Sequence, residues 1–172
     1  VRTLCITDKK DSTIWQAADF KVDCHAGQET SIAATKSLTA QMLCLALIVL
    51  KYAGLKGIDI NHYIEDLHGL AANLKKALSL RPQIKILAKF LAKYKNIVIT
   101  ADGISYALAK EACLKIKETS YLNVIASILG EFMHGHVAVM NNKIAQIHIS
   151  VDDLSYTAIK NLNKIEEDYN PP

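Results

Sequence analysis

The residues Asn96 to Gly103 read NIVITADG, and this stretch decides the fold. The β-branched run Ile97-Val98-Ile99 is typical of a strand that is covered on both faces of a parallel sheet. Asp102-Gly103 marks a turn, and the pattern that follows predicts a helix from Ser105 to about Glu118. A buried strand followed by a helix is the building unit of α/β folds.

The same order of elements occurs on both sides of this stretch. Two β-rich runs, Thr3–Thr7 (TLCIT) and Phe20–Cys24 (FKVDC), enclose a short helix through Trp15. Downstream we expect a β-leaning segment at 121–125, a short helix around 130–139, a strand at 143–150 and a last helix capped by Asp152 or Asp153. The alternation predicts an α/β fold with a mostly parallel sheet, whose ligands collect at the carboxyl ends of the strands. The loops of interest are therefore 25–35 and 101–105.

Three helices are expected between the two β-containing regions. The first, from about Ala33 to Ala53, is apolar almost all round and is predicted to be buried. Its longest uninterrupted apolar run, Met42–Leu50, is shorter than the roughly 20 residues that span a bilayer. We therefore do not expect this helix to be a membrane anchor. Two amphipathic helices follow, one over 60–78 and one after Pro82.

Composition limits the class of protein. The 172 residues are 51% hydrophobic and 22% charged, which excludes a disordered chain. The net charge of +3 is spread along the chain, and the lysines at 85, 89 and 93 are interpreted as a solvated helix face rather than a nucleic-acid site. The four cysteines form no CxxC pair, so we expect reduced thiols in a cytoplasmic protein. Cys24, at the end of an apolar strand, is not favoured as a nucleophile.

The loop Ala26–Lys36 (AGQETSIAATK) precedes the first long helix. It offers hydroxyl groups and free backbone N–H groups where an anionic or polyhydroxyl ligand can bind. The alternative is an ordinary helix start, with Thr30 or Ser31 as the N-cap.

The helix around EACLKIKE, residues 111–118, places Glu111, Lys115 and Glu118 on one face, at spacings of four and three. A carboxylate beside an ammonium group can act as a general base. The alternative is a solvated ion-pair face with no catalytic role.

The turn GEFMHGH, residues 130–136, carries His134 and His136. A metal site is not favoured, because no third ligand has a suitable spacing. A single histidine that shuttles a proton is chemically more attractive, and an exposed histidine without function remains the alternative.

These three motifs, in this order and spacing, resemble the sugar isomerase (SIS) domain family. The resemblance is greatest to the isomerase half of the glucosamine-6-phosphate synthases and to their deaminase and deglycase relatives. It implies a three-layer αβα sandwich with a parallel, flavodoxin-like sheet, present here as a fragment of a tandem pair. Residues 1–58 would be the carboxyl-terminal part of a first SIS domain, 59–90 connecting helices and 91–172 most of a second.

The resemblance also implies roles for individual residues. Glu118 would move a proton between C1 and C2 of an open-chain hexose or amino-hexose 6-phosphate, with Lys115 in the same site. His134 would open the sugar ring and come from a neighbouring subunit, which implies a homodimer. Residues that would line the sugar are Thr30, Ser31, Ile32 and Ala34. No cofactor or metal is implied, and the alternative function is a non-catalytic sugar-phosphate-sensing module.

Overall fold

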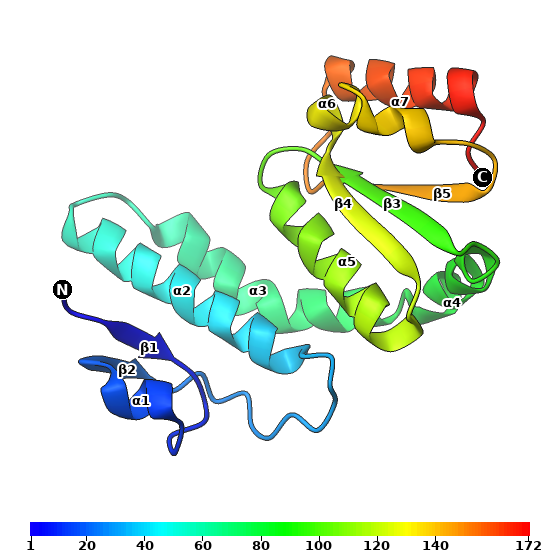
Figure 1. The fold of residues 1–172 in the computed structure, drawn as a ribbon. Helices are drawn as coiled ribbons and strands as arrows, with labels where there is room; N and C mark the ends of the chain where they lie inside the picture. The colour runs from blue at the N-terminus through cyan, green and yellow to red at the C-terminus, as the bar shows by residue number, and fades with distance from the viewer. The chain divides into compact units, whose positions relative to one another are not determined.

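The computed structural model describes all 172 residues, which divide into two compact units, Val1–Leu80 and Arg81–Pro172. Figure 1 shows the path of the chain through both units. The first unit contains β1 (Leu4–Ile6), α1 (Thr13–Ala17), β2 (Phe20–Val22), α2 (Lys36–Leu55) and α3 (Asn61–Leu78). The second contains α4 (Arg81–Leu91), β3 (Asn96–Ala101), α5 (Ser105–Ser120), β4 (Asn123–Ile128), α6 (Leu129–Phe132), the 3₁₀ turn η1 (His136–Val139), β5 (Ile144–Ile149) and α7 (Tyr156–Tyr169).

The predicted β-α-β opening is confirmed in the first unit. Strands β1 and β2 are parallel, with Leu4 opposite Phe20 and Ile6 opposite Val22. The hydroxyl of Ser12 caps α1 by accepting a hydrogen bond from the backbone N–H of Trp15 at 3.3 Å. Because the strands run in the same direction, their carboxyl ends and the loops that follow them meet at one edge.

The prediction that helix α2 is buried was wrong. None of its residues is buried, and the exposed fraction reaches 64% at Val49 and 72% at Leu55. A two-stranded sheet covers only a narrow strip of a helix that is apolar on all sides, so the remaining apolar surface is left open. Helices α3 and α4 also contain no buried residue.

Helix α2 is apolar over a longer stretch than its uninterrupted apolar run, Met42–Leu50. By length and composition alone, the 20-residue helix could cross a membrane, a property that core helices of soluble proteins share. The expectation that no segment of the chain spans a bilayer stays a prediction.

The second unit is a three-layer α/β arrangement, as predicted. Its sheet has the order β4-β3-β5, and both pairs are parallel. Helix α5 covers one face, where Ala109 and Cys113 pack with Ile97, Ile99 and other buried side chains. Helices α6 and α7 cover the other face (Figure 1). There Phe132 and Ile165 pack in one buried cluster with Val98.

The start of α7 differs from the prediction. Ser155 is its N-cap and accepts a hydrogen bond from the N–H of Ala158 at 3.1 Å, so neither Asp152 nor Asp153 caps the helix. A serine hydroxyl next to the first helical residue reaches this N–H, whereas the two aspartates are too early in the chain. Along α7, Ile165 is fully buried, whereas Ile159 is 44% exposed.

Candidate functional site

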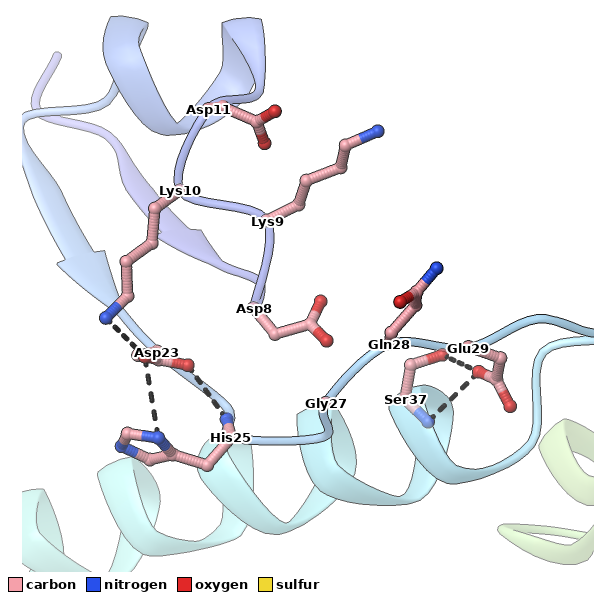
Figure 2. Close-up of a pocket in the computed structure, with 10 residues that line it drawn as sticks. All are labelled: Asp8, Lys9, Lys10, Asp11, Asp23, His25, Gly27, Gln28, Glu29 and Ser37. Atoms are coloured by element: carbon pink, nitrogen blue, oxygen red, sulfur yellow. Dashed lines mark hydrogen bonds and ion pairs between the residues drawn. The ribbon is translucent and has the colours of Figure 1, made fainter.

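A cavity of about 930 Å³ opens at the carboxyl ends of β1 and β2. Figure 2 shows that its walls come from the loop after β1, the loop after β2 and the first turn of α2. The lining residues are Asp8, Lys9, Lys10, Asp11, Asp23, His25, Gly27, Gln28, Glu29 and Ser37. The sequence pattern predicted a role for the loop after β2 but not for residues 8–11. The rule on carboxyl ends, applied to β1 as well, would have found them.

Asp23 joins the first two walls of this cavity. Its Oδ2 pairs with the Lys10 ammonium at 2.7 Å, and its Oδ1 accepts from the backbone N–H of His25 at 2.9 Å (Figure 2). The hydrogen bond from Lys10, followed by that from His25, lowers the pKa of the Asp23 carboxyl. His25 has a backbone φ of +52°, a left-handed conformation that the preceding Asp23 supports. The hydrogen bond from His25 to Asp23 therefore supports the turn after β2, and the ion pair links that turn to the loop after β1.

Glu29 occupies the amino-terminal end of α2. Its carboxylate accepts hydrogen bonds from the backbone N–H groups of Thr35, Lys36 and Ser37 at 2.9, 3.2 and 3.2 Å. The hydroxyls of Thr35 and Ser37 also donate to it. The expectation of Thr30 or Ser31 as N-cap was therefore wrong, and so was that of free N–H groups here. A carboxylate satisfies several N–H donors at once and complements the helix dipole, which a single hydroxyl does less well.

Glu29 is expected to stay ionised far into acid. The hydrogen bond from Ser37 and then the N–H of Thr35 lower its pKa from 4.5 to about 2. Because the folded-state pKa is depressed, its contribution to stability is complete above about pH 4.5 and is lost as the pH falls through 2. In an NMR titration, the amide signals of Thr35, Lys36 and Ser37 should shift with a midpoint near 2.

Glu29→Gln should abolish that titration and increase amide hydrogen exchange in the first turn of α2 several-fold. The matched control is Gln28→Ala, because Gln28 lines the same cavity but makes no hydrogen bond to the helix. A midpoint near 4.5 in the wild-type chain would contradict the proposed cap.

The four predicted sugar-lining residues lie between Glu29 and the first turn of α2 in the sequence. None of them lines the cavity. Thr30, Ser31 and Ile32 are exposed and Ala34 is half-buried. The structure thus keeps the two hydroxyls accessible on the loop and turns only the neighbouring Ala33 inward, with 5% of its surface exposed. The cavity itself contains two more carboxylates than ammonium groups. Its charge does not favour a phosphate group.

In the second unit, α5 holds the predicted acid and base cluster. The Lys115 ammonium lies 2.9 Å from Oε2 of Glu118 and 3.2 Å from Oε1 of Glu111. The three side chains are 22 to 33% exposed. The hydrogen bond to Glu118, opposed by partial burial, raises the pKa of Lys115. No hydrogen bond within the chain engages the other oxygen of Glu118, Oε1.

His134 lies in the turn between α6 and η1. Its side chain is exposed, and its backbone N–H donates to the carbonyl of Glu131 at 3.0 Å. The turn is anchored by the fully buried Phe132 and continues through Gly135, whose φ of +130° suits a residue without a side chain. No group of three or more His, Cys, Asp or Glu side chains in the chain could hold a metal ion.

The structure does not bring Glu118 and His134 together within the second unit. Helix α5 starts at the carboxyl end of β3 and runs back to the amino end of β4, so Glu118, near its end, lies at that edge of the sheet. His134 follows α6, which begins directly after the carboxyl end of β4. In Figure 1, α5 ends near one end of β4 and α6 begins at the other end. The six residues of β4 correspond to a separation of roughly 20 Å.

A second polar group, which was not predicted from the sequence, lies on the α7 face of the sheet. The buried hydroxyl of Thr100 contacts Nδ1 of His148 at 3.1 Å and accepts from the amide of Gln146 at 3.3 Å. Burial lowers the pKa of His148 and favours its neutral form. The only signal in the sequence was the alternation of Gln146 and His148 with apolar residues along β5. That pattern also fits an ordinary half-exposed strand.

Comparison with known proteins connects these features to a family. The SIS domain model matches residues 1–51 and 90–172. The chain is 31% identical over 170 residues to glutamine–fructose-6-phosphate aminotransferase [isomerizing] of Fusobacterium nucleatum, covering 96% of this chain and 28% of that protein. The enzyme of the same name from Xylella fastidiosa is 31% identical over 162 residues, covering 92% of this chain and 27% of the enzyme. The chain thus spans little more than a quarter of the length of these relatives.

Solved structures show the same fold. The C-terminal domain of glucosamine-fructose-6-phosphate aminotransferase from Francisella tularensis superposes with a TM-score of 0.90 at 28% identity, covering 97% of this chain and 48% of that one. A glucosamine-6-phosphate deaminase from Thermotoga maritima shares the fold with a TM-score of 0.74 at 18% identity, covering 99% of this chain and 50% of that one. The family model accounts for most of the chain, including the Ala26–Lys36 loop and α5. The chain belongs to the SIS domain family.

Proposed function

We propose that this chain is an isomerase domain for hexose or amino-hexose 6-phosphates that moves a proton between C1 and C2. Fructose 6-phosphate and glucosamine 6-phosphate are the expected pair, in an isomerising aminotransferase or a deaminase. The observation that carries the proposal is the half-buried Glu118 carboxylate. Its Oε2 accepts a hydrogen bond from the Lys115 ammonium, and its Oε1 accepts none within the chain. The names of the aminotransferase relatives, which contain the word isomerizing, support this reaction class.

The proposed chemistry needs one base and one fixed positive charge. Oε1 of Glu118 removes the proton from the carbon next to the carbonyl or imine of the open-chain sugar, and the electron pair moves through the new C1–C2 double bond onto the carbonyl oxygen or imine nitrogen, which gives an enediolate or enolamine. The hydroxyl proton of the deprotonated carbon then passes to that oxygen or nitrogen. The same carboxyl returns its proton to the former carbonyl or imine carbon, and the neighbouring carbon becomes the new carbonyl. Lys115, whose raised pKa keeps it charged, orients the carboxylate and offsets the negative charge that develops on the substrate.

The loop at the start of α2 is the proposed binding segment for the sugar. Thr30 and Ser31 offer exposed hydroxyls to the polyhydroxyl chain, and Ile32 and Ala34 offer small apolar surfaces next to them. The N–H groups of the first turn of α2 are engaged by Glu29, so these hydroxyls would make the contacts.

His134 is proposed to open the sugar ring in the active site of a second copy of the chain. The roughly 20 Å along β4 supports this, because a histidine at one edge of the sheet does not reach a substrate at the other edge. An active site shared between two subunits implies a homodimer in which each chain supplies Glu118 to one site and His134 to the other.

Mixing two inactive variants tests this arrangement. In randomly mixed dimers of Glu118→Gln and His134→Ala, half of the dimers are heterodimers, and each has one intact site. Roughly a quarter of the wild-type activity should therefore return. The control is each variant mixed with itself, which should stay inactive. If both residues acted within one chain, no activity would return.

The proposed domain organisation follows the same comparison. Residues 1–58 would be the carboxyl-terminal part of a first SIS domain, and residues 91–172 would form most of a second. The helices within 59–90 would connect the two domains. The division of the structure between Leu80 and Arg81, and a family model that matches 1–51 and 90–172, support a boundary in this region.

The test is proton NMR in D₂O with fructose 6-phosphate or glucosamine 6-phosphate, using the protein as it occurs in its cell. Deuterium that enters at C1 or C2 would support the isomerase, and release of ammonia from glucosamine 6-phosphate would favour a deaminase. Binding of the sugar phosphate with no exchange would overturn the enzymatic proposal and leave the sensing module.

A further inference from the structure

A second cavity, of about 640 Å³, lies between the end of β2 and one face of α2. Most of its lining is apolar, with Leu43, Leu47 and Ile48 on the helix side. Two thiols, those of Cys24 and Cys44, also line it, and neither is used in the proposed reaction. Cys24 has 8% of its surface exposed, whereas Cys44 is half-buried.

The backbone places these two thiols on facing elements. The amide of Gln41 donates to the carbonyl of Ile6 at 3.3 Å, which packs this face of α2 against the end of β1. Cys44 is three residues further along the helix and therefore lies on the same face. Cys24 donates its backbone N–H to Thr7, the residue after Ile6, at 3.4 Å. Burial and the nearby Cys24 sulfur raise the pKa of Cys44, as expected for two close thiols.

We propose that Cys24 and Cys44 are a disulfide-forming pair, and that a low-molecular-weight disulfide such as oxidised glutathione is the oxidant. The thiolate of one cysteine attacks a glutathione sulfur, which forms a mixed disulfide and releases one glutathione. The second thiolate attacks the protein sulfur of this mixed disulfide and releases the other glutathione. Two protein thiols lose two electrons, glutathione disulfide gains them, and the two protons go to the released glutathione thiols.

The proposed bond would close the loop 24–44. This loop contains Glu29 and all four proposed sugar-lining residues, so oxidation would restrict their movement. The consequence for activity rests on the proposed function, whereas the formation of the bond does not. The two are measured separately.

Mass spectrometry tests the bond directly on the full chain. Trypsin cuts after Lys21, Lys36 and Lys51, so the two cysteines fall in separate peptides, 22–36 and 37–51. After incubation with oxidised glutathione and alkylation of the remaining thiols, these two peptides should be recovered joined, and separate after reduction. The oxidised chain should also unfold at a higher temperature than the reduced chain.

Matched variants complete the experiment. Cys24→Ala and Cys44→Ala should each abolish the joined peptides, and Cys5→Ala should leave them unchanged. Recovery of Cys24 and Cys44 only as separate glutathione adducts, or joined equally often to Cys5 or Cys113, would overturn the proposal. A joined pair that leaves deuterium exchange into the sugar phosphate unchanged would confirm the bond and exclude only its effect on activity.

Discussion

Replacing Glu118 by glutamine is expected to lower the rate of deuterium exchange at C1 or C2 by about 10²- to 10⁴-fold, the usual contribution of a general acid or base. Glutamine has nearly the same size and can still contact Lys115, so the fold and the binding of the sugar phosphate should be kept. What is lost is the negatively charged carboxylate that accepts the proton, because a side-chain amide is not a base. The measurement is the D₂O exchange rate at saturating sugar phosphate, together with the binding affinity.

Glu111→Gln is the matched control for this prediction. Glu111 lies on the same face of α5, pairs with the same Lys115 at 3.2 Å and has a similar exposed fraction. Because Glu111 is not the proposed base, its replacement should change the exchange rate less than tenfold. If Glu118→Gln kept the full exchange rate, Glu118 could not be the base. Equal losses in both variants would show that the ion-pair cluster has only a structural role.

The sequence predicts most of the second unit because its signals are local. The run Ile97-Val98-Ile99 is covered from both faces, as a β-branched stretch next to an Asp-Gly turn indicates. The spacing of Glu111, Lys115 and Glu118 predicts their common helix face, and the ion pairs confirm it. The helical spacing of residues and the β-branched composition of strands are properties of short stretches of sequence. They therefore predict secondary structure without any information on tertiary packing.

The features that were missed depend on residues that meet only after folding. Glu29 is six residues before Thr35, and its capping role requires the loop to fold back onto the helix. Exposure of α2 depends on how much sheet is present to cover it, which the apolar pattern of the helix does not contain. These are consequences of topology rather than of local pattern.

The largest expected effect on stability is that of Phe132→Ala. Phe132 is fully buried and packs with Val98, Leu129 and Ile165 between the sheet and α7. Removing a buried phenyl ring costs about 3–5 kcal/mol, a large part of the roughly 5–15 kcal/mol that stabilises a domain. The second unit should therefore unfold at a much lower denaturant concentration, as measured by far-ultraviolet circular dichroism.

Two comparisons make this prediction specific to the second unit. Val139→Ala, at a site that is 52% exposed in the neighbouring turn, should change the stability by less than about 0.5 kcal/mol. The single tryptophan, Trp15, belongs to the first unit, so its fluorescence reports on that unit alone. A loss of Trp15 signal at the same denaturant concentration as the loss of helix would show that the two units unfold together.

Phe132 also connects stability to the proposed reaction, because it anchors the turn that presents His134 two residues later. Its loss should free this turn even under conditions in which most of the chain stays folded. Ring opening would then slow while proton exchange on an open-chain substrate persists, because Glu118 is held by α5 on the opposite face of the sheet. Equal losses of both steps in a folded Phe132→Leu variant would contradict a separate role for the turn.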